Sequence, residues 1–548
     1  MDWETEDPGE TAGGDAPEQS GRDERRHWGQ YFTPPALVEQ MLEWVGYRPE
    51  ADLEQVTLLD PACGTGNFLV AAAERLMTHG QARGWSRARV LAALQTNLCG
   101  IEADPRVYIE AEARLQALAA ALKTDQPSPQ AALDASNSPR FQLRQGDALA
   151  LPAEPRYQLV LSNPPYLSSR KHPGLVPPAS RKGAGQRDAY LLFVEQACRW
   201  VAPGGWLGLV LPDAFLTRAN AAQARNMLRH AFTLTHLEHR AGVFRAQVGT
   251  AVLIAQRVER PAYSMLPWRR LDRAQARQRQ EGTRGAFAGE VWRQQPRAEL
   301  RYLLGAAESA LFTRLMEEVP WTPLGNLVTI SRGEEVGRRA SRLVFAAGED
   351  RVPVLRGGED VLPFRCRFAG AYLPRHLVKK PLERYQTSKV LVVKSSGRLC
   401  TALDEQGSIA LQTLYLLHPR PGAPALECLV AVLNSHLLRS ALWLYYTAYK
   451  LVQPQIEQGT LASLPFPLFP AAAQQELAAL AGQLRFSFQQ EDEQRQPPSA
   501  RAASCGAEAG PVQLRQTTRE LTTLLNARIA ALCGLSAAEQ ALLEQFPV

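Results

Sequence analysis

From about Gln30 to Arg257, short runs rich in leucine and β-branched residues alternate with alanine-rich stretches that suit helices. Residues 68–77 and 190–201 are two of these helical stretches. Chains that alternate in this way form mostly parallel sheets with helices on both faces, and uniformly apolar runs suit strands buried on both sides. The pattern predicts an α/β domain whose seven strands cover residues 56–59, 98–102, 141–144, 158–162, 206–211, 234–238 and 251–255.

The alternation stops beyond about Pro261, which predicts further domains. Residues 321–467 hold short strand-like runs broken by Gly and Pro, with a helix around 426–446, as is typical of a mixed α+β fold. The arginine-rich stretch 268–280 is expected to be a helix or a linker. The predicted parts are a disordered tail over 1–28, an α/β domain over 29–262, a second domain over 263–470, and a linker with a C-terminal helical segment over 471–548.

Composition limits the partners and the cellular location that we expect for this chain. The 548 residues carry a net charge of +6, which mildly favours a polyanionic partner. No apolar run reaches the length of a membrane span, and the amino terminus lacks the layout of a secretory signal. The eight cysteines show no zinc-binding spacing. We therefore expect a cytoplasmic monomer with reduced thiols, no metal centre and no membrane association.

The first candidate site follows the first predicted strand. Asp60 leads into Pro-Ala-Cys-Gly-Thr-Gly, and a helix begins at Asn67-Phe68. Gly64 and Gly66 let the backbone approach a ligand closely at the carboxyl edge of the sheet, where open α/β sheets bind ligands. The alternative, a phosphate-binding loop, needs a Lys-Ser/Thr at the helix start or a third spaced glycine, and this loop has neither.

Two acidic residues end the next predicted strands, Glu102 and Asp147. A carboxylate that ends the second strand is placed to accept bonds from the two hydroxyls of a ribose. One that ends the third strand can accept a bond from an adenine amine. The alternative for each is a cap on the following helix, but their order after the glycine loop favours a nucleoside site.

The run Asn163-Pro164-Pro165-Tyr166 ends the fourth predicted strand and carries the chemistry. Two prolines stiffen the turn, so the Asn side-chain oxygen and a following backbone carbonyl can be aimed as acceptors at one amino group. Adenine N6 is a poor nucleophile because its lone pair is delocalised into the ring. Two acceptors on its hydrogens stabilise the charge that develops during attack, and Tyr166 offers a face for stacking.

With these motifs in order, the sequence resembles the gamma-type, TaqI-like family of DNA adenine-N6 methyltransferases, strongly over residues 29–258 and more weakly over 321–467. The resemblance implies a Rossmann-like, seven-stranded AdoMet-dependent methyltransferase domain followed by a mixed α+β target-recognition domain. It implies S-adenosyl-L-methionine as cofactor, with the segment Gln30–Pro34 at its methionine end. The implied cofactor-binding residues are Tyr31, Thr33, Asp60, Ala62, Gly64, Gly66, Phe68, Glu102, Ala103, Asp147, Ala148 and Asn163.

The same resemblance implies catalysis by the Asn163–Tyr166 turn, with Phe244 as the second aromatic that holds an extruded base. Phe215 is the alternative, and either ring could instead be a core aromatic. The basic loop 168–187 is a candidate DNA clamp or an ordinary surface loop.

In the second domain, residues 354–360, 433–435, 453–456 and 464–467 resemble the family's target-recognition region. Arg332, Arg338 and Arg339 are candidates for reading base edges in the major groove, although most such arginines contact phosphate or water.

We therefore expect a site-specific adenine-N6 methyltransferase that acts on double-stranded DNA in a restriction-modification or phage-defence system. One alternative is methylation of a protein glutamine or an RNA adenine, whose enzymes need no large domain after the catalytic one. Another is a DNA-binding defence subunit that requires a partner subunit, with the helical segment from Val512 as a docking surface.

Overall fold

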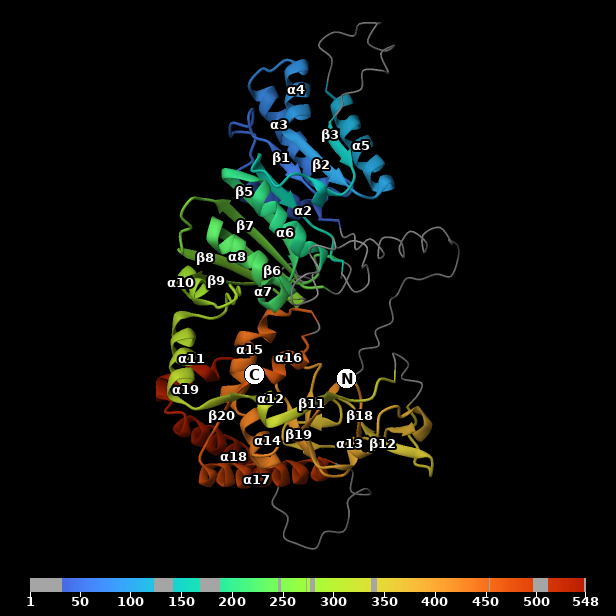
Figure 1. Ribbon diagram of the computed structural model, residues 1–548, viewed down its shortest axis with the longest axis vertical. Helices are drawn as coiled ribbons and strands as arrows, with labels where there is room; N and C mark the ends of the chain where they lie inside the picture. The colour runs from blue at the N-terminus through green and yellow to red at the C-terminus, as the bar shows by residue number, and fades with distance from the viewer. Residues whose placement is uncertain are drawn as a thin grey trace. The chain divides into compact units, whose positions relative to one another are not determined.

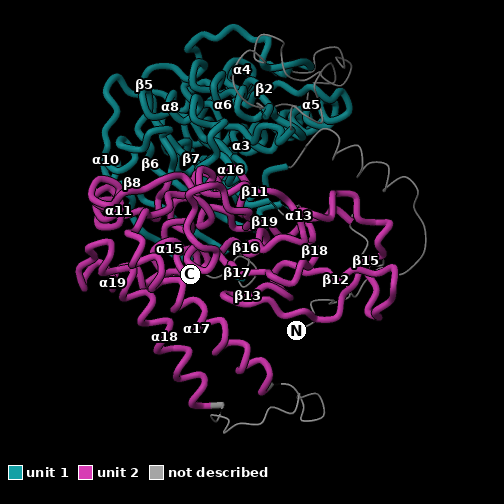
Figure 2. The backbone as a smooth tube through the Cα atoms, turned by 60° about the horizontal axis from the view of Figure 1, so that its bottom comes forward, with its two compact units in different colours: residues 1–300 teal, residues 301–548 magenta. Residues whose placement is uncertain are grey.

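The computed structural model describes residues 32–122, 141–167, 188–244, 248–272, 274–275, 281–336, 343–452, 454–495 and 511–546. The predicted tail over residues 1–28 lies outside them. The chain divides into two compact units, Met1–Leu300 and Arg301–Val548 (Figure 2).

Unit 1 is built on a nine-stranded sheet with the order β3-β2-β1-β4-β5-β7-β6-β8-β9. Strands β1 to β5 pair in parallel, and β7 runs antiparallel to both β5 and β6. The strands are β1 Leu58–Asp60, β2 Leu98–Glu102, β3 Gln142–Gln145, β4 Tyr157–Ser162, β5 Val201–Pro212, β6 Phe232–Arg240, β7 Thr250–Arg257, β8 Met265–Leu271 and β9 Thr283–Ala288.

Helices cover both faces of this sheet (Figure 1). Leu159 and Leu161 of β4 pack in the core with α2 and α3, while Val160 points to the other face and is also fully buried. That second face is covered by α6 and α8, which pack against each other (Figure 1). The helices are α2 Pro35–Trp44, α3 Asn67–Ala82, α4 Arg87–Asn97, α5 Pro105–Ala120, α6 Ala189–Trp200, α7 Ala214–Thr217, α8 Ala222–Ala231 and α10 Gly289–Gln294, with 3₁₀ turns η3 Ala148–Ala150 and η6 Ala219–Ala221.

The predicted α/β class is confirmed, but the sheet is larger than the seven strands expected. The stretch 268–280, expected to be a helix or a linker, begins inside β8, and β8 and β9 form an antiparallel pair at the sheet edge. The first unit therefore runs to Leu300, past the predicted boundary at residue 262. These strands were not predicted because they carry polar and charged residues. One of them, Arg269 of β8, pairs at 3.6 Å with the buried carboxylate of Glu238 on β6.

Unit 2 contains a four-stranded sheet with the order β11-β19-β16-β17, covered by α14, and several smaller sheets. Its strands are β10 Trp321–Pro323, β11 Val328–Arg332, β12 Arg351–Leu355, β13 Val361–Leu362, β14 Arg365–Cys366, β15 Tyr372–Pro374, β16 Lys389–Val393, β17 Thr401–Asp404, β18 Ile409–Ala410, β19 Leu414–Pro419 and β20 Pro465–Pro467. Its helices are α11 Ala306–Glu318, α12 Leu324–Leu327, α13 Glu383–Gln386, α14 Leu426–Leu433, α15 His436–Tyr445, α16 Gln458–Ala462, α17 Ala471–Arg495, α18 Pro511–Leu532 and α19 Ala537–Glu544, with 3₁₀ turns η8 Arg375–Leu377 and η9 Thr447–Tyr449.

The C-terminal helices belong to the core of unit 2. Helix α17 packs on α14, and α18 packs on α17. Leu477 of α17 and Leu525 of α18 lie in the same apolar cluster as α14. The described helices within 471–546 thus pack in the core of unit 2, and α17 continues to Arg495, into the stretch expected to be a linker.

Within the described residues, no single helix has both the length and the apolar character to cross a membrane. The bent pair Leu426–Leu433 and His436–Tyr449 passes by length and composition alone. Most of its apolar side chains, however, are buried in the core of unit 2.

Candidate active site

The loop between β1 and α3 turns sharply at two glycines. Gly64 has a φ of 55° and Gly66 a φ of 82°, in the left-handed region that glycine adopts without strain. A Cβ atom on Gly64 would lie 3.0 Å from two ring atoms of Phe32. The chain just before α2 therefore packs directly on the glycine loop.

Asp60 ends β1 and is 1% exposed. Its Oδ1 accepts a bond from the backbone N–H of Ala62 at 3.2 Å. Burial, with a smaller contribution from the nearby Glu102 carboxylate, raises the pKa of Asp60 from 3.8 to about 8. The Asp60 side chain is therefore mostly protonated near neutral pH.

Glu102 ends β2 and ties two chain segments together. Its Oε2 accepts from Gly64 N–H and its Oε1 from Asp104 N–H, both at 2.9 Å. Burial raises the pKa of Glu102, and these bonds partly oppose the rise. Each carboxylate oxygen has a further lone pair, so the side chain can still accept bonds from two hydroxyls. Ala103, directly after it, is exposed.

Asp147 follows β3 and is exposed. Its Oδ1 accepts from Leu149 N–H at 2.9 Å and so caps the short turn η3, while Ala148 is buried. Gly146 N–H donates to the Glu102 carbonyl at 2.9 Å, which holds this segment beside the end of β2. Asp147 thus acts as the cap that was its alternative role, and a contact with adenine stays a prediction.

The Asn163–Tyr166 turn follows β4, at the same edge of the sheet. Asn163, Pro165 and Tyr166 are half-buried and Pro164 is buried. The Tyr166 hydroxyl donates to the Val210 carbonyl at 3.1 Å, which fixes the ring.

Phe244, far along the chain, lies beside this turn. Its ring centroid is 6.2 Å from that of Tyr166, and the ring of Tyr190 on α6 also meets Tyr166 edge to face, with centroids 6.3 Å apart. Phe244 is 8% exposed, whereas Phe215 is completely buried. Of the two aromatics considered from the sequence, Phe244 is thus the one that the fold brings to Tyr166.

One pair of side chains at this edge was not recognised from the sequence. Asp213 follows β5, and its Oδ2 lies 3.8 Å from Nε2 of the completely buried His239 on β6. Burial lowers the pKa of His239, against the opposing effect of Asp213. A Cβ atom on Gly249 would lie 2.1 Å from the Asp213 oxygen, so the Asp213 side chain would have to shift to admit a larger residue there. The sequence holds a weak signal for this pair, since Asp213 follows a strand end as Glu102 and Asp147 do.

Two more of the predicted cofactor-binding residues are buried. Phe68, the second residue of α3, is 2% exposed and packs in the core of unit 1. Thr33 is 4% exposed, and its carbonyl accepts from the Asn67 side chain at 2.8 Å. Tyr31, the loop 168–187, Arg338, Arg339 and Gln453 lie outside the described residues.

In unit 2, two of the predicted recognition residues make contacts within the unit. Arg332 pairs with Glu335 at 2.7 Å. The Asn434 side chain holds both backbone groups of Thr401, at 2.8 and 3.0 Å. These contacts order the segments, and base reading by Arg332 stays a prediction.

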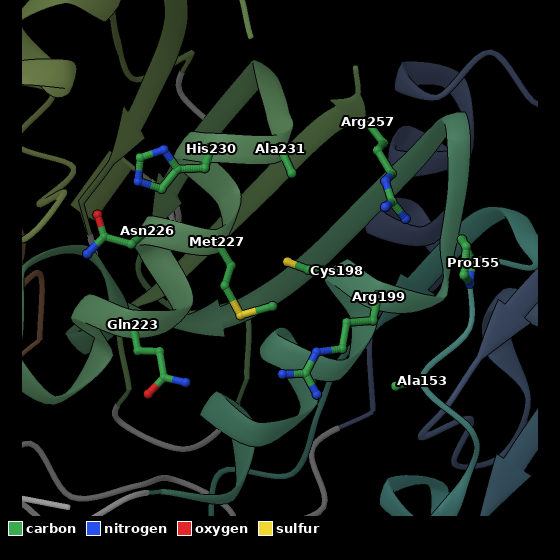
Figure 3. A pocket seen from close by; sticks show the side chains of 10 residues that line it. All are labelled: Ala153, Pro155, Cys198, Arg199, Gln223, Asn226, Met227, His230, Ala231 and Arg257. Atoms are coloured by element: carbon green, nitrogen blue, oxygen red, sulfur yellow. The ribbon is translucent and has the colours of Figure 1, made fainter. Parts of the chain in front are cut away.

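A separate open groove of about 790 Å³ lies between α6 and α8. Figure 3 shows the sulfur atoms of Cys198 and Met227 in this groove. Arg257 at the end of the antiparallel β7 and Pro155 before β4 also line it. The groove is therefore at the amino ends of the parallel strands, opposite to the edge that carries Asn163.

Two sequence families match this chain. Residues 18–257 match the family described as N-6 DNA Methylase, and residues 352–466 match the TaqI-like C-terminal specificity domain. The resemblance inferred from the motifs is therefore confirmed, in the order in which the two domains were predicted.

Curated proteins and solved structures are also similar to parts of this chain. The type II methyltransferase M.XhoI of Xanthomonas vasicola is 27% identical over 275 residues, which cover 48% of this chain and 46% of the relative. M.PaeR7I of Pseudomonas aeruginosa is 28% identical over 38% of this chain and 35% of the relative. The chain thus spans less than half the length of these curated relatives. The cryo-EM structure of a DrdV–DNA complex is similar in fold alone, at 13% identity and a TM-score of 0.53 over 86% of this chain and 58% of that one.

Proposed function

We propose that this chain, which joins an N-6 DNA methylase domain to a TaqI-like C-terminal specificity domain, transfers a methyl group from S-adenosyl-L-methionine to N6 of an adenine in a specific duplex DNA sequence. The observation that carries the proposal is the adjacency of two strand ends. β1 and β4 pair in parallel, with Leu58 beside Leu159. The glycine loop after β1 and the Asn163 turn after β4 therefore start about 5 Å apart.

The residues of the first unit fit this cofactor. The two left-handed glycines bring the backbone close to a ligand, and a larger residue at position 64 would strike Phe32. Glu102 keeps lone pairs for the ribose hydroxyls, and Asp147 lies at the next strand end for the adenine amine. When bound, the cofactor supplies a methyl carbon that is electrophilic because it is attached to a sulfonium. Ala62, Ala103 and Ala148 offer small side chains around the nucleoside.

Asn163 supplies the acceptor side of the reaction. Its side-chain oxygen and the Pro164 carbonyl accept the two hydrogens of N6, which localises the lone pair on nitrogen and stabilises the charge that develops there. Pro164 and Pro165 keep these acceptors rigid. Holding the nitrogen in line with the methyl group adds proximity and orientation, and no side chain has to act as a base before attack.

The target adenine must leave the duplex, because a stacked base cannot reach a buried site. Extrusion costs a few kcal/mol, which stacking on protein aromatics partly offsets. Tyr166 provides the stacking face, and Phe244 supports its ring from the side.

The second unit favours DNA over the protein or RNA substrates of related enzymes. It occupies Arg301–Val548 and includes the stretch that matches a specificity domain. We infer that it selects the DNA sequence, in a restriction-modification setting like that of the similar type II methyltransferases. A partner subunit that uses the C-terminal helices stays an alternative to a monomer.

The test is to express the chain in a bacterial host without DNA methylation and to sequence its genomic DNA with a modification-sensitive single-molecule method. We expect N6-methyladenine at one defined motif, lost in Asn163→Ala. If the soluble protein binds the cofactor but leaves every adenine unmodified, the proposal fails. A missing partner, or a protein or RNA substrate, would then be tested next.

A further inference from the structure

The segment Phe32–Pro34, just before α2, lies across the glycine loop and is anchored there. The ring of Phe32 packs against Gly64. The carbonyl of Thr33 accepts a hydrogen bond from the Asn67 side-chain NH₂ at 2.8 Å, and Thr33 is 4% exposed. Asn67 is the first residue of α3, directly after the glycine loop. One amide side chain therefore joins two segments that are 34 residues apart.

Arg114 fixes the orientation of the Asn67 side-chain amide by binding its oxygen. Arg114 of α5 donates Nη1 to Asn67 Oδ1 at 2.7 Å and to the Thr65 carbonyl at 2.6 Å. A guanidinium can only donate, so the Asn67 oxygen must face Arg114, and its NH₂ must then face Thr33. Hydrogen bonds thus connect Arg114 of α5 to Asn67 and, through Asn67, to Thr33 before α2. We call this chain of hydrogen bonds the relay.

The strand order shows which end of the cofactor this segment adjoins. Across the sheet the strand ends follow the order β3, β2, β1, β4. On the proposed function, Asp147 after β3 takes the adenine, Glu102 after β2 takes the ribose, and Asn163 after β4 meets the methyl group. The segment packed on Gly64 after β1 therefore lies on the sulfonium and amino-acid side of the ribose.

We propose that Asn67 and Arg114 are positioning residues that hold the Phe32–Pro34 segment as the wall of the cofactor site beside the amino-acid end. Neither residue needs to touch the cofactor. The inference rests on the proposed cofactor, and it predicts that loss of the relay weakens ligands that carry the amino-acid end more than ligands that lack it.

Asn67→Asp is the most selective variant because it keeps the oxygen that faces Arg114 and replaces the NH₂ that donates to Thr33 with a carboxylate oxygen, which repels the Thr33 carbonyl. Binding is measured by calorimetry with two ligands, S-adenosylhomocysteine and 5′-methylthioadenosine, and the second of these lacks the amino acid. We expect the affinity for S-adenosylhomocysteine to fall roughly tenfold, the effect of one lost hydrogen bond in a closed site, with little change for methylthioadenosine. Arg114→Met should shift the ratio of the two affinities in the same direction, because the side-chain amide of Asn67 can then rotate away from Thr33.

Asn97→Asp is the matched control. The Asn97 side chain also donates to backbone carbonyls, at 2.8 Å to Glu54 and 3.3 Å to Leu53, in the same unit but away from the glycine loop. It should lower thermal stability and leave the ratio of the two affinities unchanged. Hydrogen exchange of the first turn of α2, whose Leu37 and Val38 amides bond to the Pro34 carbonyl, gives a second readout. S-adenosylhomocysteine should slow this exchange in the wild type and less so in Asn67→Asp.

Equal losses for both ligands in Asn67→Asp, or no loss for either, would overturn the positioning role. These outcomes are independent of DNA. A wild type that binds both ligands but methylates no adenine contradicts the proposed function. The ratio of its affinities for the two ligands, compared with that of Asn67→Asp, still tests the positioning role of Asn67 and Arg114. A wild type that binds neither ligand contradicts the cofactor assignment and the relay together.

Discussion

The ring of Tyr166 meets that of Phe244 edge to face, with centroids 6.2 Å apart and planes at 79°. Phe244 is 8% exposed and Tyr166 half-buried, so the supporting ring is the more enclosed of the two. An edge-to-face contact sets the angle between the two rings. On the proposed function, Tyr166 stacks on the extruded base and Phe244 holds the angle of its ring, and substitutions can separate these two roles.

Tyr166→Phe keeps the ring and removes the hydroxyl that donates to the Val210 carbonyl. We expect a loss of about 1 kcal/mol in the free energy of unfolding and a small change in kcat/KM. Tyr166→Ala removes the stacking face, and kcat/KM for duplex DNA should fall roughly 10- to 100-fold, since base stacking on an aromatic is worth about 1–3 kcal/mol. Similar activity losses in the two variants would argue against stacking.

Asn163→Ala removes one of the two proposed acceptors for N6. Methyl transfer should fall by roughly 10²- to 10³-fold or more, as expected for loss of a preorganised electrostatic contact. Calorimetry should show nearly wild-type affinity for S-adenosylhomocysteine. Substantial residual turnover would remove Asn163 from the reaction.

Glu102→Ala should weaken both S-adenosylhomocysteine and methylthioadenosine, because both carry the ribose. This pattern differs from that expected of Asn67→Asp, so the two variants separate the ribose end from the amino-acid end. Calorimetry with both ligands is the measurement. Unchanged affinities would leave Glu102 with only its observed bonds to the N–H groups of Gly64 and Asp104.

Gly64→Ala adds a methyl group 3.0 Å from the Phe32 ring at a φ of 55°. Gly84→Ala is its control, since Gly84 has a similar φ of 66° but no atom within 4 Å of the added carbon. Both should lose about 1 kcal/mol from the left-handed backbone. Only Gly64→Ala should also weaken cofactor binding. If the two variants behave alike in calorimetry, the close approach of Phe32 has no role in binding.

The buried carboxyl of Asp60 predicts a pH dependence of stability. Because burial raises its pKa to about 8, the folded state keeps a proton that the unfolded state loses above 3.8. The contribution of Asp60 to the free energy of unfolding therefore falls as pH rises from about 4 to 8, by up to about 1.4 kcal/mol per pH unit. Asp60→Asn should flatten urea-derived stability across this window. A wild type whose stability rises through the same window, with Asp60→Asn following it in parallel, would contradict this assignment.

Local sequence patterns were enough to predict the strands that position the site. The stretch 98–102 is β2 itself and ends at Glu102, and Asp60 directly follows the predicted strand 56–59 and ends β1 in the structure. These features depend on periodicity and turn chemistry within a few residues. The β8–β9 pair was missed because edge strands with charged side chains lack the apolar alternation that marks a strand.

The relay through Asn67 could not be predicted from the sequence for a different reason. Arg114 and Asn67 are 47 residues apart, and both occupy helices where polar residues are ordinarily solvated. Only the packing of α5 beside α3 brings them together. The same holds for Asp213 and His239, whose strands are neighbours of β7 and not of each other.

Because α18 packs in the core of unit 2, this core can be completed only late in the synthesis of the chain. Leu525 and Ile529 of α18 are each 1% exposed and close the apolar cluster that also holds α14. Unit 1, by contrast, is complete by Leu300. Because domains fold as they leave the ribosome, unit 1 is finished first, and unit 2 gains its full core only once α18 has emerged. On the proposed function, a growing chain could then bind the cofactor before it can discriminate among DNA sites.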